Sequence, residues 1–340
     1  MRILYGVQTT GRGHIMRARE MVKNLKAKGH TIHILFSGRQ PDMAGRMQEF
    51  QPFSAFQGLT FVTERGKLKI LKTAMQLNFV RFYQDIRHFD ASEFDLVITD
   101  YEPISARIAR RHNIPSIGIG HQYAFMHRVP LSGDTFITRL VMRRFAPVDY
   151  PVGLHWHHFQ QPICPPIITD AMPEDVMPDA KRILVYMPFE SLQDTIDALQ
   201  PLSGYDFYLY SAEVAQASDD KTMHLRPLSR EHFLRDLGKS VGLISNAGFS
   251  SMSEALHLGK RLLVKPLSGQ LEQESNAAAL RKLQLGMTMA TLNTEAIRAW
   301  LDAEDHIAPQ NYPDVVNHLC QWVNDGTWSS YKTMAQNSWN

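Results

Sequence analysis

Short apolar runs alternate with stretches of helical spacing along the amino-terminal part of the chain. The runs that have the length of buried strands are residues 2–7, 31–36, 95–99 and 116–119. The stretches that are expected to form helices are residues 14–28 and 103–112. Alternation of this kind predicts a parallel sheet with helices on both faces.

The carboxyl-terminal half repeats the pattern. Strands are expected at residues 182–186, 206–210, 241–244 and 261–265, and helices near residues 192–199, 230–237, 250–258 and 276–283. Prolines that oppose regular structure separate the halves: Pro147, Pro151, Pro162, Pro165, Pro166, Pro173 and Pro178. The fold class is therefore α/β, with two Rossmann-like, doubly wound parallel-sheet domains that face each other across a cleft.

The length of 340 residues suits two domains that each bury a core. We expect an amino-terminal domain at residues 1–160, a proline-rich linker at residues 161–180 and a second domain at residues 181–324. A net charge of +2 gives no reason to expect nucleic acid as a partner. Because only two cysteines are present, and no signal peptide or apolar run of membrane-spanning length is evident, we expect a cytoplasmic location.

A turn of small residues follows the expected strand at residues 241–244, and a helix begins directly after it. Backbone N–H groups of such a turn and the positive end of the helix dipole favour an anion such as a diphosphate. We call residues 246–251 the phosphate turn. Its expected contacts are Asn246, Ala247, Gly248, Ser250 and Ser251.

Polar residues for a ribose and a sugar follow at fixed offsets. Glu254 lies about one helical turn after the phosphate turn, where its carboxylate can accept hydrogen bonds from a ribose diol. Glu272 and Gln273 follow the next strand, with Gln270 just before them. A carboxylate beside an amide suits a polyhydroxylated sugar, because each hydroxyl group offers both a donor and an acceptor.

These motifs resemble the donor-binding half of GT-B glycosyltransferases that use UDP-sugars. The matching segments are the phosphate turn, Ser251-Met252-Ser253-Glu254-Ala255-Leu256, Gly259-Lys260-Arg261, Pro266 and Glu272-Gln273-Glu274-Ser275-Asn276-Ala277. The chain departs from the pattern in Glu272, where Asp is usual, in the missing proline after Gly259, and in two extra residues after Pro266. Taken as a whole, it resembles a bacterial and archaeal branch near the glucuronosyltransferase and peptidoglycan N-acetylglucosaminyltransferase groups.

The resemblance implies further donor contacts and the course of the tail. Ser191 lies in a loop that closes over the diphosphate in related folds, and it can also cap a helix. Arg226 begins a segment that would hold the uracil edge through backbone groups. A carboxyl-terminal helix at about residues 325–340 would pack back on the first domain.

The loop after the first strand contains His14 together with Gly11 and Gly13, two glycines that we count among the expected donor contacts. It does not match a dinucleotide-binding turn, because Met16 stands at the sixth position and no acidic residue follows the second strand. A histidine at a helix amino terminus can stay neutral and act as a general base. The resemblance implies that His14 deprotonates an acceptor hydroxyl, whereas the alternative is a histidine that caps or packs.

Other side chains are expected beside His14. Asp100, just past a strand, would orient the imidazole, or it would cap the helix that begins at Pro103. Glu102 is the next candidate. His121 and Arg17 could face the acceptor, although packing and a structural ion pair are the simpler interpretations of these two residues.

The preferred hypothesis is an inverting, metal-independent glycosyltransferase with a UDP-sugar as co-substrate, no other cofactor, and a glycan, lipid-linked or small-molecule acceptor. The alternatives are a UDP-sugar hydrolase, in which His14 activates water, and a nucleotide-sugar-binding protein without turnover. Residues 67–87 and 138–145 mix basic and apolar side chains. They could form a peripheral membrane contact, or ordinary half-buried helices.

Overall fold

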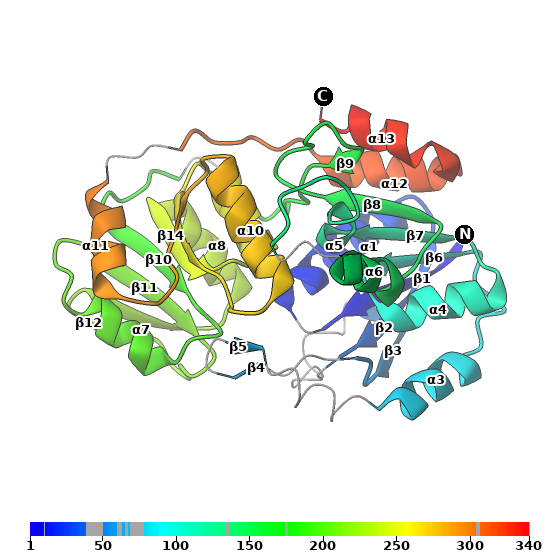
Figure 1. Cartoon of the computed structure of the whole chain (residues 1–340), viewed down its shortest axis with the longest axis horizontal. Coiled ribbons are helices and arrows are strands. Elements are labelled where there is room, and N and C mark those ends of the chain that lie inside the picture. Colours follow the sequence, from blue (N-terminus) through cyan, green and yellow to red (C-terminus); the bar gives the residue numbers. More distant parts are fainter. Residues whose placement is uncertain are drawn as a thin grey trace.

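The computed structural model describes residues 1–9, 11–38, 50–59, 63–64, 67–68, 78–132, 136–173, 176–303 and 307–339. Two α/β domains lie side by side, each built on a seven-stranded sheet (Figure 1). The two-domain α/β architecture expected from the sequence is confirmed.

The first sheet is parallel throughout. Its strands, in spatial order, are β3 (Phe53–Phe56), β2 (Thr31–Ser37), β1 (Arg2–Gln8), β6 (Leu96–Asp100), β7 (Ser116–Gly120), β8 (Tyr150–Leu154) and β9 (Ile163–Cys164). The helices of this half are α1 (Arg12–Ala27), α3 (Phe79–His88), α4 (Pro103–His112), α5 (His121–Ala124) and α6 (Phe136–Phe145), and β4 (Thr63–Glu64) pairs with β5 (Lys67–Leu68) in a small separate sheet.

Helix α1 packs against the first sheet through one apolar face. Ala18, Met21, Val22 and Leu25 recur at helical spacing and are all buried, so they form one apolar stripe. The residues belong to the same core cluster as Ile3 and its neighbours on β1. Helix α1 therefore starts at the carboxyl end of β1 and runs back along the sheet.

The second sheet is parallel except for one edge strand. Its order is β12 (Ser218–Asp220), β13 (Met223–Pro227), β11 (Asp206–Ser211), β10 (Arg182–Tyr186), β14 (Gly242–Asn246), β15 (Arg261–Lys265) and β16 (Met287–Thr288), and β12 runs antiparallel to β13. The helices are α7 (Leu192–Leu199), α8 (Arg230–Lys239), α9 (Phe249–His257), α10 (Leu271–Lys282) and α11 (Thr294–Asp302). Helix α10 begins earlier than residue 276, because Gln270 caps it by accepting from the Gln273 N–H.

The end of the chain returns to the first domain. Helices α12 (Val315–Asp325) and α13 (Tyr331–Asn337), joined by the short helix η2 (Trp328–Ser330), lie against α1, β8 and β9 (Figure 1). The first domain therefore includes β9, beyond residue 160, and α12, which the expected boundary at residue 324 had assigned to the second domain. None of the described helices has the length and apolarity to cross a bilayer.

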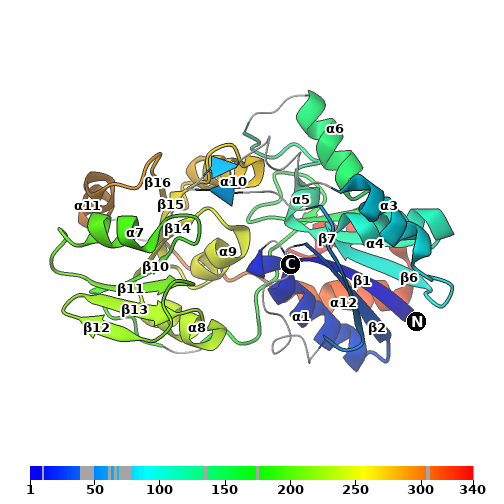
Figure 2. The same ribbon diagram turned by 90° about the horizontal axis from the view of Figure 1, so that it is seen from below.

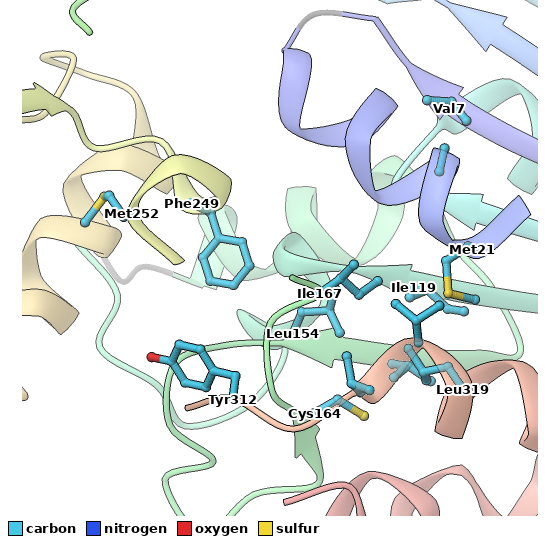
Figure 3. Close-up of a cluster of buried hydrophobic side chains, with 14 of the residues drawn as sticks. Val7, Met21, Ile119, Leu154, Cys164, Ile167, Phe249, Met252, Tyr312 and Leu319 are labelled. Carbon is cyan, nitrogen blue, oxygen red and sulfur yellow. The ribbon is translucent and has the colours of Figure 1, made fainter. Parts of the chain in front are cut away.

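Apolar packing is continuous between the two domains. Figure 3 shows Phe249 and Met252 of α9 in the same buried cluster as Leu154, Cys164 and Leu319 of the first domain. The ring of Phe249 stacks on His121 at a centroid distance of 3.8 Å. This packing fixes the amino end of α9 against the first domain.

The packing of α12 against the first domain predicts that this helix contributes to the stability of that domain. Leu319 of α12 is fully buried, so Leu319→Ala should destabilise the first domain by about 2–5 kcal/mol through the cavity it leaves. Hydrogen–deuterium exchange should increase in β1 and α1, far away in sequence. Leu140→Ala, at a leucine that is 41% exposed, is the matched control. Faster exchange confined to the second sheet would contradict this packing.

Candidate active site

The carboxyl edge of the first sheet brings His14 and Asp100 together. Strands β1 and β6 are neighbours, and Val7 pairs with Asp100 in their register. Helix α1 begins after Gly11, which places His14 in its first turn. The Nδ1 atom of His14 lies 3.1 Å from Oδ1 of Asp100, and both residues are buried. The structure therefore contains the imidazole–carboxylate pair that the sequence suggested.

Arg17 connects this pair to the second domain. Its Nε and Nη2 atoms donate to the two carboxylate oxygens of Asp100 at 2.9 and 3.0 Å. Its Nη1 atom donates to Oγ of Ser250, in the phosphate turn, at 3.0 Å. The sequence left two interpretations of Arg17 open, an acceptor contact and a structural ion pair. The structure contains the ion pair and buries Arg17 between the His14–Asp100 pair and the phosphate turn.

The charge of Asp100 is stabilised inside the protein. Burial by itself would raise the pKa of this carboxyl, but the positive charge of Arg17 and the contact with His14 outweigh burial, and the pKa lies below its ordinary value. An ionised Asp100 can accept the Nδ1 proton of His14. Nδ1 of His14 lies between Oδ1 of Asp100, at 3.1 Å, and Nη2 of Arg17, at 3.0 Å. In the tautomer whose Nδ1 proton points to Asp100, Nε2 is the acceptor nitrogen, and no hydrogen bond to Nε2 is found in the described part of the chain.

Two helix amino termini converge next to these residues. Strand β14 ends at Asn246, and α9 begins at Phe249 with Gly248 as its N-cap. Figure 2 shows α9 at the border of the two domains, next to α1. A Cβ atom added to Gly13 would lie 2.4 Å from Oγ of Ser250, so a larger residue at this position would displace the hydroxyl that Arg17 contacts. Both helix dipoles make the site favourable for an anion.

Comparison with known proteins agrees with this geometry. A family model described as Glycosyl transferase family 1 matches residues 1–303. The chain belongs to this glycosyltransferase family. A sequence comparison with curated proteins finds no match.

Solved glycosyltransferases share the GT-B fold over almost the whole length of the chain. SsfS6 of Streptomyces sp. SF2575, solved with thymidine diphosphate, has 13% identity and a TM-score of 0.64, and the match covers 96% of this chain and 99% of that one. SnogD of Streptomyces nogalater has 16% identity and a TM-score of 0.57, with 99% and 98% covered. SpnG, solved with spinosyn aglycone, has 12% identity and a TM-score of 0.56, with 99% and 97% covered.

Several residues that were expected to bind the nucleotide-sugar instead use their side chains in hydrogen bonds to the backbone of the protein. The amide of Asn246 bonds to the Phe189 N–H and the Lys265 carbonyl. Ser191 caps α7 and Gln270 caps α10, while Oε1 of Gln273 accepts from the Leu267 N–H. The side-chain oxygens of Gln270 and Gln273 are thus used within the chain, and a sugar contact of these two residues stays a prediction. The N–H of Gly248 already donates to the Asn246 carbonyl at 2.7 Å, and the Ser251 hydroxyl donates to the Gly248 carbonyl. What the phosphate turn offers a ligand is therefore mainly the backbone N–H groups of the first turn of α9, which have no partner within the helix.

Glu254 is not free in this structure. Arg230, the first residue of α8, grips both of its carboxylate oxygens, with Nη1 at 2.9 Å from Oε2 and Nη2 on Oε1. Each carboxylate oxygen has two lone pairs, so a ribose hydroxyl can bind beside the guanidinium. Glu254 therefore stays a ribose candidate, with Arg230 as a partner that the sequence analysis missed.

Glu102 was the next candidate, after Asp100, for orienting His14 on the acceptor side, and the structure gives it another role. The residue is fully buried, and its carboxylate accepts from the N–H groups of Ile104 and Ser105 and from the Ser37 hydroxyl. It is the N-cap of α4, the role that had been considered for Asp100. Burial raises the pKa of the Glu102 carboxyl. Its carboxylate bonds to the start of α4 and to strand β2, and none of these bonds involves His14.

His121 has the packing role that was its simpler interpretation, and the side chain of Arg226 lies at an edge strand. The ring nitrogens of His121 bond to the Leu154 carbonyl and to Oδ1 of Asn276, which leaves neither for an acceptor. The side chain of Arg226 bonds to Asp219 on the edge strand β12. A uracil contact through the Arg226 backbone stays a prediction.

A second missed feature is an ion pair at the carboxyl edge of the second sheet. Nζ of Lys265, the last residue of β15, lies 2.6 Å from Oε1 of Glu190, in the loop after β10. The same carboxylate oxygen accepts from Asn246. Lys265 ends a strand, as Asp100 does, and this position could have identified it from the sequence as a residue at the carboxyl edge of the sheet.

The buried pair of Arg17 and Asp100 predicts a pH-dependent loss of stability. Removing one partner of such a pair costs about 3–5 kcal/mol, so Asp100→Asn should lower the free energy of unfolding at neutral pH. Because the folded pKa of Asp100 is depressed, its contribution is complete above the ordinary Asp pKa of about 4 and declines as the pH falls through the folded value.

Urea unfolding at a series of pH values measures this effect. The gap in stability between wild type and Asp100→Asn should be largest at neutral pH and shrink below about pH 4. Asp302→Asn, at an exposed residue that ends α11, is the control. A gap that is constant with pH would show that the Asp100 charge contributes nothing to folding.

Proposed function

We propose that this glycosyltransferase transfers a sugar from a UDP-sugar to a hydroxyl group of an acceptor, with inversion at the anomeric carbon and without a metal ion. One observation supports this proposal above the others: Arg17 contacts both Asp100 and Ser250. Arg17 thereby holds the His14–Asp100 pair of the first domain next to the phosphate turn of the second domain.

In the proposed step, Nε2 of His14 removes the proton from the acceptor hydroxyl. Asp100 accepts the Nδ1 proton and stabilises the imidazolium that forms. The acceptor oxygen forms a bond to the anomeric carbon while the bond from that carbon to the diphosphate oxygen breaks, and the electron pair leaves with UDP. A single displacement from the opposite face inverts the configuration.

The departing diphosphate would be stabilised by the phosphate turn. Backbone N–H groups at the start of α9 and the dipole of that helix point at the position where negative charge develops. These fixed donors supply charge compensation without a bound cation, which is the reason for proposing a metal-independent reaction.

The nucleotide is the next part of the proposal. SsfS6 and VinC were solved with thymidine diphosphates, which supports a pyrimidine nucleoside diphosphate as the leaving group here. The motif around Glu254 and Glu272 resembles that of enzymes that use UDP-sugars, and a carboxylate near the ribose favours a nucleotide with both hydroxyls. We therefore propose uridine rather than thymidine.

Cytoplasmic location and contact with a membrane surface are also proposals. Helix α3 exposes Phe79, Val80 and Tyr83, and α6 exposes Leu140 beside the exposed Arg143. Apolar and basic side chains together favour an anionic membrane surface. Residues 69–77, within the stretch that suggested this contact, lie outside the described part of the chain.

A nucleotide screen tests the function as a whole. Thermal shift with UDP, thymidine diphosphate and their sugar conjugates identifies the donor, and UDP release is then followed with and without a mixture of hydroxyl acceptors. Transfer to an acceptor supports the proposal. Rapid release of free sugar without an acceptor would favour the hydrolase, and binding without any product would favour a sensor.

His14→Ala should reduce turnover by about a hundredfold to ten-thousandfold, because the general base is removed. The affinity for UDP should stay nearly unchanged, since the phosphate turn lies in the other domain. Turnover is measured by UDP release and affinity by calorimetry. His112→Ala, at an exposed histidine that ends α4, is the control. A parallel loss of UDP binding would show that His14 serves the donor instead.

Glu254→Ala should weaken UDP binding by about 1–3 kcal/mol, because ribose hydroxyls lose their acceptor. The loss should be smaller for thymidine diphosphate, which lacks the 2′-hydroxyl, whereas any disturbance of Arg230 affects both nucleotides alike. Calorimetry on both nucleotides measures the difference. Glu231→Ala, beside Arg230 on α8, is the control. Equal losses for the two nucleotides would reject the ribose contact.

A further inference from the structure

Gln122 is a buried polar residue that links the two domains at the candidate active site. It lies in α5, directly after β7, and is only 7% exposed. Its Nε2 atom donates to Oε2 of Glu272, at the start of α10, over 3.0 Å. Only the amide nitrogen can donate to a carboxylate, so this contact fixes the orientation of the amide.

The other end of the amide is unpaired. Oε1 of Gln122 is buried, and no hydrogen-bond partner for it exists among the residues that the structure describes. Leaving a buried carbonyl oxygen without a donor costs free energy, and such groups in folded proteins almost always have a partner. The oxygen is therefore suited to receive a donor from a ligand.

This oxygen lies next to the His14–Asp100 pair. A Cβ atom placed on Gly120 would be 2.6 Å from Oδ1 of Asp100 and 3.5 Å from Oε1 of Gln122. Both oxygens thus flank the same glycine. Gln122 therefore spans the distance between the proposed base and Glu272, the residue expected to bind the sugar.

The oxygens of Gln122 and Glu272 favour a ligand group that can donate a hydrogen bond. Oε1 of Gln122 and the carboxylate of Glu272 can only accept. Arg17, whose charge interacts with Glu272, is already bonded to Asp100 and Ser250. A sugar hydroxyl can donate to such oxygens. A sugar carboxylate has no proton to donate at neutral pH, and it would meet the negative charge of Glu272.

We propose that Gln122 and Glu272 together bind hydroxyl groups of the transferred sugar, so that the donor is a nucleotide of a neutral sugar and not of a uronic acid. This inference rests on the proposed function, because it requires a nucleotide-sugar in the site. Gln122 acts as a specificity-determining residue. Since its partner Glu272 belongs to the other domain, the sugar is held by both domains at once.

Calorimetry with matched ligands isolates the sugar contact. The probes are UDP, UDP-glucose, UDP-galactose, UDP-N-acetylglucosamine and UDP-glucuronate, with the thymidine diphosphate series in parallel. In Gln122→Met, the affinity for the best neutral donor should fall by about threefold to tenfold, the usual value of one hydrogen bond to an uncharged group. The affinity for UDP alone should stay the same. Gln193→Met, at an exposed glutamine of α7, is the control.

Each outcome decides between the possibilities. An equal loss for the free nucleotide and the nucleotide-sugar would show that Gln122 only supports the fold, and would overturn the proposal. Wild-type protein that prefers UDP-glucuronate to every neutral donor would overturn the sugar class. If the wild type binds none of the nucleotides, the proposed function itself is wrong, and this inference is wrong with it.

Discussion

The structure depends on one buried cation. Arg17 is 5% exposed and gives its guanidinium to both oxygens of Asp100 and to the hydroxyl of Ser250. A charge this deeply buried is stable only with a well-placed partner, and the same holds for the carboxylate. The ion pair therefore fixes the end of β6 against α1, and its third hydrogen bond fixes α9 against both.

This arrangement explains how one site is made from two domains. The amino ends of α1 and α9 meet so closely that a Cβ atom at position 13 would displace the Ser250 hydroxyl, which bonds to Arg17. Two positive helix ends and an arginine would repel each other without Asp100, whose carboxylate lies among them. Once Arg17 is neutralised, the helix ends keep their attraction for a further anion. The diphosphate of the proposed donor would match that remaining potential.

The sequence predicted the parts of the site that depend on local position. His14 and Asp100 follow strands β1 and β6, and parallel strands present their carboxyl ends at the same edge, so their proximity could be inferred. The choice between Asp100 and Glu102 as the cap of α4 could not be made, because both stand just before Pro103. Contacts across the interface were invisible for another reason. Gln122 and Glu272 are 150 residues apart, and no periodicity relates them.

Donor binding in this enzyme must work with the contacts that already join the domains. Three hydrogen bonds join the domains here: Arg17 to Ser250, Gln122 to Glu272, and His121 to Asn276. The resemblance places the second residue of each pair in the donor motif. A nucleotide-sugar that enters between the domains has to replace or extend these hydrogen bonds. Its net affinity is therefore the difference between the new contacts and those it displaces. In the role proposed for Gln122, its unused acceptor would add affinity without that loss, and for this reason it would discriminate among sugars.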